Sequence, residues 1–216
     1  MARSAAQPAT RQPSTRDRAL AAALELFDSQ GVAATTIEQL RDASGISTGS
    51  LYHHFGSREG LIAALYEDLL QHYRAVLAPA LAGCGGPRPL LDTFVATHIG
   101  WAVTHPAATR FLAEHRRNPA VTGTAETRLQ RGTADFLRPL LAQLKPAMDA
   151  GLLRPLPPEL LLSQVLGPVQ TWLKLWLDGH SSLKPDAAVR QLADLIWAAV
   201  AMPDAPQPSP SARSST

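Results

Sequence analysis

Five neighbouring residues in the first quarter of the chain have the types and spacing of a surface that contacts nucleic acid. The hydroxyls of Thr48 and Ser50 can reach phosphate oxygens or base edges, and the rings of Tyr52 and His53 can pack on sugar and backbone. Gly49 between them lets a helix backbone approach a groove closely. Placed on one helix face, these residues predict contact with double-stranded DNA.

Short helices must hold these groups in place, and the first two are predicted before residue 46. In the first helix apolar residues recur at intervals of three and four, and Gly31 is a stop signal. The second begins at Thr35-Thr36, where Thr35 and Glu38 have capping-box spacing, and ends near Gly45. The recurring apolar residues of the first helix are Leu20, Ala23, Leu24 and Phe27.

The third helix begins at Ser47, a good N-cap, and runs through Tyr52 towards Gly56. The connection through Gly45 lets the chain reverse before it, as in a helix-turn-helix unit. The third helix then exposes the polar groups described above, while four apolar residues fill the small core. These core residues are Ile37, Leu40, Ile46 and Leu51.

The rest of the chain is also predicted to be helical, so the expected fold class is all-α. Ser57 caps a long amphipathic helix from Arg58 to about Leu81, and a glycine-rich stretch ends it. No segment alternates with period two for long enough to be a strand. Further helices are predicted at 88–104, 106–115, 120–150, 157–178 and 185–202, about nine in total, with breaks or kinks near Pro139 or Pro146 and near Gly167-Pro168.

Residues 19–65, ALAAALELFDSQGVAATTIEQLRDASGISTGSLYHHFGSREGLIAAL, resemble the TetR family of bacterial transcriptional regulators. The resemblance implies a DNA-binding head, a homodimer and a small-molecule effector of unknown identity. It also implies that Thr36, Ser47 and Arg58 contact phosphates from the starts of three helices, where backbone N–H groups and the helix dipole favour anions. The matching positions are Leu26-Phe27, Gly31, Thr35-Thr36-Ile37, Gly45-Ile46-Ser47, Gly49-Ser50-Leu51-Tyr52 and Phe55.

Three positions within this match differ from many relatives or carry an unusual residue. Arg41 stands where many relatives have a small residue, and Arg58 stands where many have lysine. Gly60 replaces a polar or acidic residue and is expected to loosen the first turn of its helix. The expected layout is a disordered basic arm at 1–13, a DNA-binding domain at 14–60, a ligand-binding and dimerisation domain at 61–202 and a disordered tail at 203–216.

The last two long helices carry apolar residues around too much of their surface to pack on one side. The resemblance assigns them to a four-helix bundle with the same helices of a second copy; the alternative is the buried core of a monomer. The predicted interface residues are Leu161, Val165, Val169, Trp172, Trp176, Leu192, Leu195, Ile196 and Val200.

The middle helices are expected to enclose a cavity for a mostly apolar effector with a few polar groups. Aromatic residues at helical spacing are also typical of a hydrophobic core. The alternative for each residue is therefore that it packs in the core rather than lining a cavity. The candidate lining residues are Tyr66, Tyr73, Phe94, His98, Trp101, Phe111, His115 and Phe136.

Several other classes of function find no support in the sequence. The histidines lack metal-ligand spacing, no catalytic constellation appears, and no cofactor is expected. Cys84 lies between glycines and is expected to be an exposed loop cysteine, with a redox sensor as the alternative. No apolar run is long enough for a membrane span and no secretory signal is present, so a cytoplasmic protein is expected.

The charge of the predicted head is balanced, although the whole chain has a formal net charge of +2. Residues 1–60 hold six arginines and six acidic residues, and four of these arginines lie within the first eighteen residues. Binding by placed contacts and a cationic arm is therefore expected, rather than by bulk attraction. The alternative function is a helical protein that binds a small molecule or a partner and has lost operator binding.

Overall fold

The computed structural model describes residues 13–116, 118, 121, 138 and 141–203, and this part of the chain is helical apart from one isolated bridge between Leu153 and Ala201. The all-α fold class is thereby confirmed. Residues 141–149 form a further helical segment, so much of the predicted 120–150 helix lies outside the described residues. The named helices are α1 (Thr15–Gln30), α2 (Ile37–Ser44), α3 (Thr48–Phe55), α4 (Arg58–Ala82), α5 (Pro87–Thr104), α6 (Pro106–His115), α9 (Pro158–Leu177) and α10 (Pro185–Val200).

The first four helices begin at side-chain caps, whereas α5, α6, α9 and α10 begin at a proline without such a cap. The hydroxyls of Ser47 and Ser57 accept N–H groups of Ser50 and Gly60 at 3.2 and 3.0 Å, which confirms both predicted caps. The predicted start of α2 is one residue too early, because Thr36 is its N-cap.

Thr35, by contrast, is buried, and its hydroxyl donates to the Gly31 carbonyl at 2.9 Å. The capping box of α2 therefore pairs Thr36 with Gln39 rather than Thr35 with Glu38.

Prolines lie inside three helical stretches without ending them. Pro168 lies within α9, Pro79 within α4, and Pro146 within the segment 141–149. The predicted break near Pro139 falls outside the described residues.

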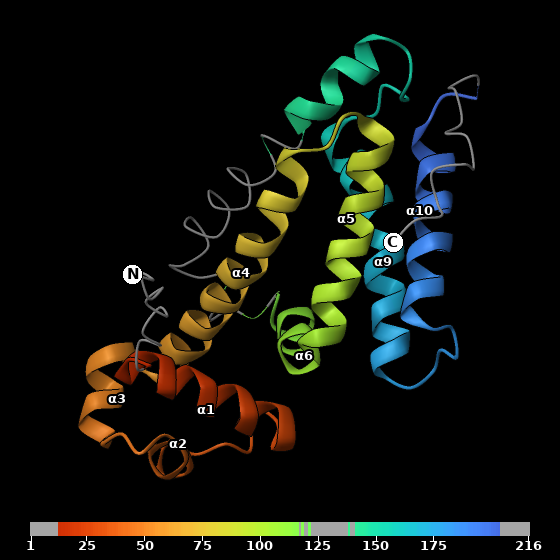
Figure 1. Cartoon of the computed structure of the whole chain (residues 1–216). Coiled ribbons are helices and arrows are strands. Elements are labelled where there is room, and N and C mark those ends of the chain that lie inside the picture. Colours follow the sequence, from red (N-terminus) through yellow and green to blue (C-terminus); the bar gives the residue numbers. More distant parts are fainter. Residues whose placement is uncertain (1–12, 117, 119–120, 122–137, 139–140, 204–216) are drawn as a thin grey trace, which may run out of the picture.

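The helices form a small head and a larger bundle joined by α4 (Figure 1). Helices α1 and α3 pack against α4 and α2 packs against α1 and α3, while α10 packs along α5 and α9. The predicted boundary after residue 60 falls inside α4, so both units share this helix. No helix among the described residues is both long and apolar enough to cross a bilayer.

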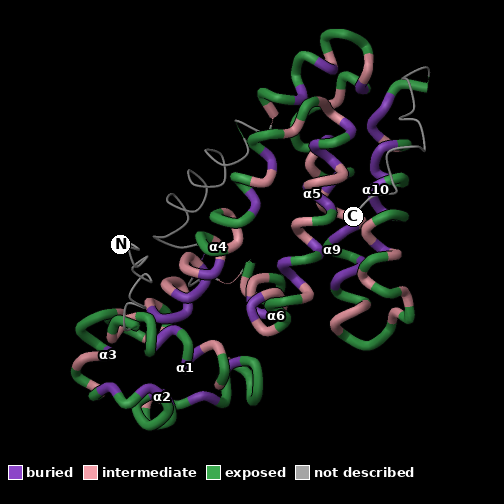
Figure 2. The backbone as a smooth tube through the Cα atoms, in the orientation of Figure 1, coloured by how far each residue is buried: buried purple, intermediate pink, exposed green. Residues whose placement is uncertain are grey.

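Two hydrophobic cores run through the molecule, and buried positions follow the inner faces of the helices (Figure 2). The head core joins α1–α3 to the first half of α4 and to α6. Its buried members include Leu40, Ile46 and Leu51, as predicted, whereas Ile37 is half-buried. The bundle core joins the second half of α4 to α5, α9, α10 and the segment 141–149.

Candidate nucleic-acid interface

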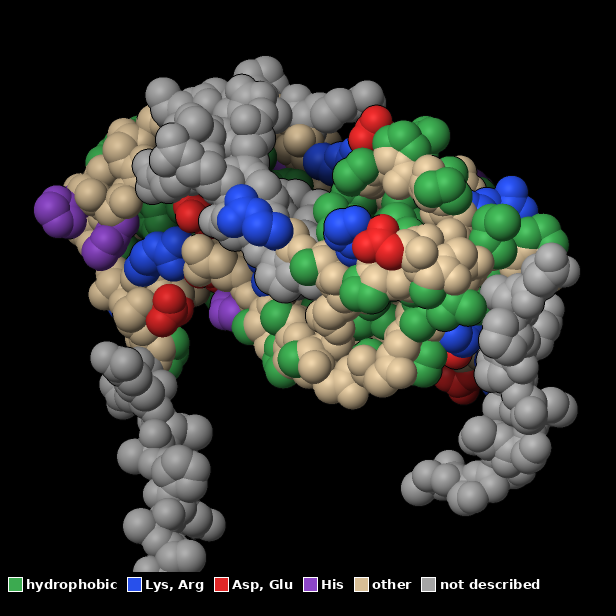
Figure 3. All heavy atoms as spheres, turned by 90° about the horizontal axis from the view of Figure 1, so that it is seen from above, with side chains coloured by type: hydrophobic (Ala, Val, Ile, Leu, Met, Phe, Trp, Pro, Cys, Tyr) green, Lys and Arg blue, Asp and Glu red, His purple; other side chains and the backbone are tan. Residues whose placement is uncertain are grey.

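Helix α3 is anchored in the head core by the buried Leu51 and the half-buried Phe55, while Gly49, Tyr52, His53 and His54 are exposed. Leu51 is 4% exposed in the head core, whereas Tyr52 is 51% exposed. His53 and Gly49 are exposed, and Thr48 is half-buried on the same side of the helix. The spacing of these residues at i, i+1, i+4 and i+5 places them on one face. In Figure 3, histidine side chains stand at the outer edge of the head.

His54 is a further exposed residue of α3 that the sequence prediction omitted. Its ring lies 5.7 Å from the ring of His53, in an edge-on arrangement, and 6.0 Å from that of Phe55. The two adjacent histidines lie in the last turn of the helix. Sequence position alone could have identified His54, since it follows His53 directly.

The N-terminus of α2 is held by reciprocal hydrogen bonds. The Thr36 hydroxyl accepts the Gln39 N–H at 3.2 Å, and the Gln39 side-chain oxygen accepts the Thr36 N–H at 2.8 Å. Thr36 is exposed, so its side chain remains accessible next to the first N–H groups of α2.

Arg58, at the first turn of α4, reaches back to the head rather than out into solvent. Its Nη2 donates to the Val32 carbonyl in the α1–α2 connection, and the residue is half-buried. In this arrangement the guanidinium ties α4 to the head. A phosphate contact by Arg58 would have to share or replace this bond.

Gly60, which is expected to loosen the first turn of α4, lies where the chain leaves no room for a side chain. A Cβ atom at this position would collide with the carbonyl oxygen of Phe55. The absence of a side chain therefore permits close approach of the end of α3 to the start of α4. At Gly49, in contrast, a Cβ would meet no atom within 4 Å.

Two of the four described arginines in residues 13–60 form ion pairs with carboxylates. Arg41, an exposed residue of α2, pairs with Asp42 at 2.7 Å. Arg16 of α1 pairs with Asp68 of α4 at 2.8 Å. These pairs reduce the free positive charge of this unit, in line with the charge balance of its sequence.

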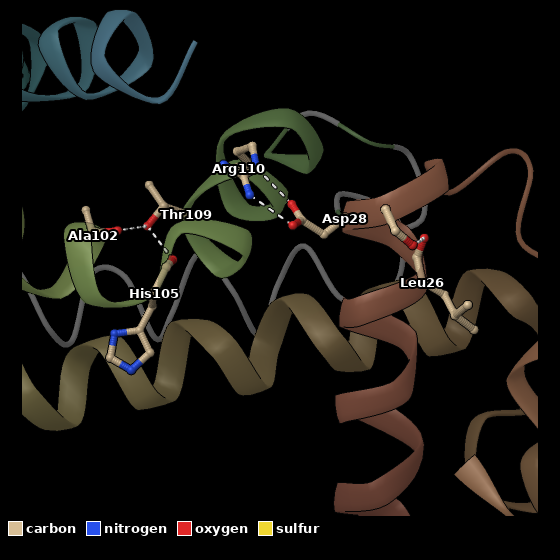
Figure 4. A network of polar contacts seen from close by, with 7 residues as sticks. Leu26, Asp28, Ala102, His105, Thr109 and Arg110 are labelled. Carbon is tan, nitrogen blue, oxygen red and sulfur yellow. Dashed lines mark hydrogen bonds and ion pairs between the residues drawn. The ribbon is translucent and has the colours of Figure 1, made fainter. Parts of the chain in front are cut away.

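Helix α6 is joined to the end of α1 by a stacked ring pair and by a bidentate ion pair, of which Figure 4 shows the ion pair. The rings of Phe27 and Phe111 lie 5.9 Å apart with planes 8° from parallel. Arg110 donates to both oxygens of Asp28 at 2.8 and 2.9 Å, and these bonds lower the pKa of the Asp28 carboxyl. Sequence analysis missed this joint because its partners are 82 residues apart.

Four predicted pocket residues meet between α4 and α5. The Tyr73 hydroxyl and Nδ1 of His98 share a hydrogen bond of 2.5 Å, and the Tyr73 ring lies edge-on to Trp101 at 5.2 Å. The rings of Phe94 and His98 lie 5.5 Å apart. Burial lowers the pKa of His98 to about 4 and raises that of Tyr73, so both groups are neutral near pH 7.

The other predicted pocket residues are dispersed. Phe111 and His115 stack at 4.3 Å on α6, and Tyr66 is buried in the head core. Phe136 lies outside the described residues. A small apolar crevice between α5, the segment 141–149 and α9 is lined by Phe94 and leucines such as Leu90 and Leu144.

Seven of the nine predicted interface residues belong to the core of their own chain, which is the alternative that the sequence left open. Their contact with a second copy stays a prediction. Trp176 is half-buried and Leu195 is 64% exposed. The seven buried residues, at most 8% exposed, are Leu161, Val165, Val169, Trp172, Leu192, Ile196 and Val200.

The exposed apolar side chains of α9 and α10 are different ones. Leu160 is 50% exposed, and Leu175 is 44% exposed, beside the 64% of Leu195. The indole N–H of Trp172 is buried without a hydrogen-bond partner among the described residues.

Cys84 is less exposed than the sequence predicted. Cys84 is half-buried, packs against the bundle core and directs its thiol to the Ala80 carbonyl at 3.6 Å. Within the described residues, histidine, cysteine and carboxylate side chains form no cluster able to hold a metal ion.

Comparison with known proteins agrees with this arrangement of helices. Residues 19–65 match the family described as "Bacterial regulatory proteins, tetR family". The transcriptional repressor KstR2 of Rhodococcus jostii is 37% identical over 86 residues, which are 38% of this chain and 40% of that repressor. The chain therefore spans well under two thirds of that relative's length.

Longer matches have lower identity. The transcriptional regulator HbdR of an Aromatoleum species is 24% identical over 165 residues, covering 74% of this chain and 70% of HbdR. A TetR family transcription regulator from Marinobacter aquaeolei shares the fold with a TM-score of 0.74 at 20% identity, covering 87% of this chain and 95% of that one. The relatives named here are regulators rather than enzymes, in agreement with the prediction that this chain is no enzyme.

The family match falls on the helices that present Tyr52 and Thr36, and the shared fold extends through the bundle. Residues 19–65 of this chain are therefore similar to the bacterial regulatory proteins of the tetR family, and the described helices share the fold of TetR family structures.

Proposed function

We propose that the chain is a ligand-responsive transcriptional regulator that binds a palindromic operator as a homodimer. The observation that carries this proposal is the outward face of α3, where Tyr52 is 51% exposed while Leu51 is buried beneath it. An exposed aromatic ring among hydroxyls suits contact with sugar, phosphate and base edges. The proposed contacts are those of Thr36, Ser47, Thr48, Gly49, Ser50, Tyr52, His53 and Arg58.

A second copy is needed because one helix-turn-helix head makes few contacts. Two heads about 34–36 Å apart would read half-sites one turn of DNA apart. We propose that the copies meet through the outer faces of α9 and α10. The exposed Leu160, Leu175 and Leu195, together with the half-buried Trp176, supply the apolar surface for this contact.

We propose that the effector is a small, mostly apolar molecule that binds among the aromatic residues of α4 and α5. The neutral Tyr73–His98 pair would offer its polar groups, since a polar ligand atom buried in an apolar site needs a partner. Ligand binding would shift α4, which connects this site to the head. Such a shift requires the effector to bind the two states of the protein with different affinity.

Repression is the proposed direction of control, and release by the effector is the proposed switch. The relative KstR2 is named as a transcriptional repressor, which favours this choice. A regulator of this kind acts where the chromosome lies, so we propose a cytoplasmic location.

A gel-shift titration of the full-length protein on the palindromic DNA nearest its own gene tests the proposal. We expect a retarded complex that survives excess non-specific DNA. Binding no stronger than to non-specific DNA would contradict operator recognition and favour a helical binding protein without DNA.

The variant Tyr52→Ala tests the face of α3 in the same titration. We expect weaker operator binding with an unchanged molecular mass in light scattering. A change to a monomer would show that Tyr52 supports the fold instead of contacting DNA.

A further inference from the structure

The end of α1 and the start of α2 are joined by a pair of side-chain amides. Gln30, the last residue of α1, donates from Nε2 to the Gln39 side-chain oxygen at 2.9 Å and to the Thr35 hydroxyl at 3.2 Å. Gln39 returns a longer bond to the Gln30 side-chain oxygen at 3.4 Å. One glutamine therefore holds residues on both sides of Thr36.

The same Gln39 oxygen serves two donors. It accepts the Thr36 N–H at 2.8 Å as well as the Gln30 amide. Without Gln30, the Gln39 amide is free to rotate towards water, and the Thr36 N–H loses its fixed partner. Thr35 is held in a similar way, because its hydroxyl accepts from Gln30 and donates to the Gly31 carbonyl at 2.9 Å.

This arrangement leaves Thr36 fixed but available. In the described part of the chain its hydroxyl accepts one bond, from the Gln39 N–H, and donates none. The first N–H groups of α2 lie beside it, unpaired within the helix. A fixed hydroxyl next to a helix N-terminus is suited to a single phosphate oxygen.

Stability alone gives a weak reason for this network. Gln30 and Gln39 are exposed, and water can replace exposed hydrogen bonds at little cost. The value of the amide pair lies in orientation, since it restricts side chains and backbone before a phosphate arrives.

We infer that Gln30 is a positioning residue for operator binding, acting through Gln39 to hold Thr36 and the N-terminus of α2 against one phosphate of each half-site. This inference rests on the proposed function. Gln30 itself touches no DNA in this arrangement.

The test uses the full-length protein and an operator duplex selected from random DNA by that protein. In a series of duplexes, one phosphate at a time is replaced by an uncharged methylphosphonate, and affinity is measured by fluorescence anisotropy. The phosphate bound by α2 is the one whose replacement weakens the natural protein but not Thr36→Ala.

We expect Gln30→Met to bind the unmodified operator about 5- to 30-fold more weakly, as the loss of roughly one hydrogen bond in each of two heads implies. We also expect the penalty at the α2 phosphate to disappear in this variant, while penalties at other phosphates remain. Gln143→Met, at an exposed glutamine of the segment 141–149, is the matched control and should behave as the natural protein.

Two substitutions of Gln39 separate positioning from simple support of the fold. Gln39→Glu keeps the oxygen that accepts from Thr36 and Gln30, so the penalty at the α2 phosphate should remain even if the added charge lowers overall affinity. Gln39→Met removes that oxygen and should abolish the penalty.

The possible outcomes distinguish a failure of the role inferred for Gln30 from a failure of the proposed operator binding. If Gln30→Met keeps the full penalty at the α2 phosphate, Gln30 is no positioning residue, although operator binding stands. If Thr36→Ala identifies no phosphate, the inference also fails. If random DNA yields no preferred duplex for the natural protein, the proposed function itself is contradicted.

Discussion

The head and the bundle use their helices in opposite ways. In α3, of eight residues, Leu51 alone is buried and Phe55 packs against the head core, while four residues are exposed. In α10, of sixteen residues, six are buried against the same chain, and Leu195 stands out as the large exposed apolar residue. The small head offers a broad face, whereas the bundle leaves a narrow strip for a second copy.

Adjacent residues of α10 give the strongest test of this contrast. Ile196 is 1% exposed, so Ile196→Ala should lower the free energy of unfolding by about 2–5 kcal/mol through lost burial and a cavity. Leu195→Ala should change the stability of the monomer by less than about 0.5 kcal/mol, because Leu195 is 64% exposed.

Denaturant unfolding at several protein concentrations measures both effects. Leu195→Ala is expected to weaken association of the two copies. A higher protein concentration should then be needed to reach the same unfolding midpoint as the natural protein. Equal losses from the two substitutions would show that the single-chain burial does not describe the protein in solution.

The dependence of stability on pH tests how deeply His98 is buried in the bundle. Burial lowers the pKa of His98 from 6.5 to about 4, so the unfolded chain takes up a proton at higher pH than the folded chain does. Stability should therefore fall as the pH drops from 6.5 to 4, by up to about 3 kcal/mol at 1.36 kcal/mol per unit.

His98→Gln keeps a polar group for Tyr73 and removes the titration. Thermal unfolding between pH 4 and 7 should show a flatter profile for this variant than for the natural protein. Parallel profiles would place His98 in contact with water.

Two glycines on either side of the α3–α4 turn give an intermediate effect. Gly60→Ala should destabilise the head by about 1–3 kcal/mol, because its Cβ collides with the Phe55 carbonyl. Gly49→Ala, in open space, should stabilise α3 by up to about 1 kcal/mol while it weakens operator binding through a methyl group on the proposed DNA face.

Thermal unfolding and operator titration together separate these glycines. The expected pattern is opposite in sign for stability. Unimpaired operator binding by Gly49→Ala would move the DNA to another face of α3.

The smallest effect is expected at the joint between head and bundle. Arg110 lowers the pKa of Asp28 below its usual 3.8, so this joint stabilises the protein above about pH 4 and is lost as the pH falls through the folded pKa. Because both side chains are partly exposed, Asp28→Asn should cost less than about 1 kcal/mol at pH 7.

The control for Asp28→Asn is Asp42→Asn, which breaks a more exposed pair within α2. Chemical unfolding at pH 7 and pH 3 should show a difference for Asp28→Asn at pH 7 that shrinks at pH 3. An undiminished difference at pH 3 would assign the effect to packing.

Local chemistry made the head predictable. The caps Ser47 and Ser57 act on N–H groups three residues away, so sequence spacing is sufficient to locate them. Thr35 and Thr36 have the same side chain, and the contact of Thr35 with Gly31 decides which of them caps α2. The sequence alone therefore does not predict which of the two threonines is the N-cap.

Contacts between residues that are far apart in the sequence could not be predicted from it. Periodicity shows that α9 and α10 are apolar around much of their surface, but it does not show which neighbour covers Val169 or Ile196. The Asp28–Arg110 joint leaves no sequence pattern either, because an aspartate and an arginine 82 residues apart have no fixed register.

Helix α4 couples the stability of the head to that of the bundle, because it contributes residues to both hydrophobic cores. Its 25 residues place Leu65 and Leu69 in the head core and Leu77 and Leu81 in the bundle core. Tyr73, between them, packs against both cores. Loss of either core would strip half of this helix of its tertiary support, so head and bundle should melt as one cooperative unit, with backbone amides along α4 among the slowest to exchange their hydrogens.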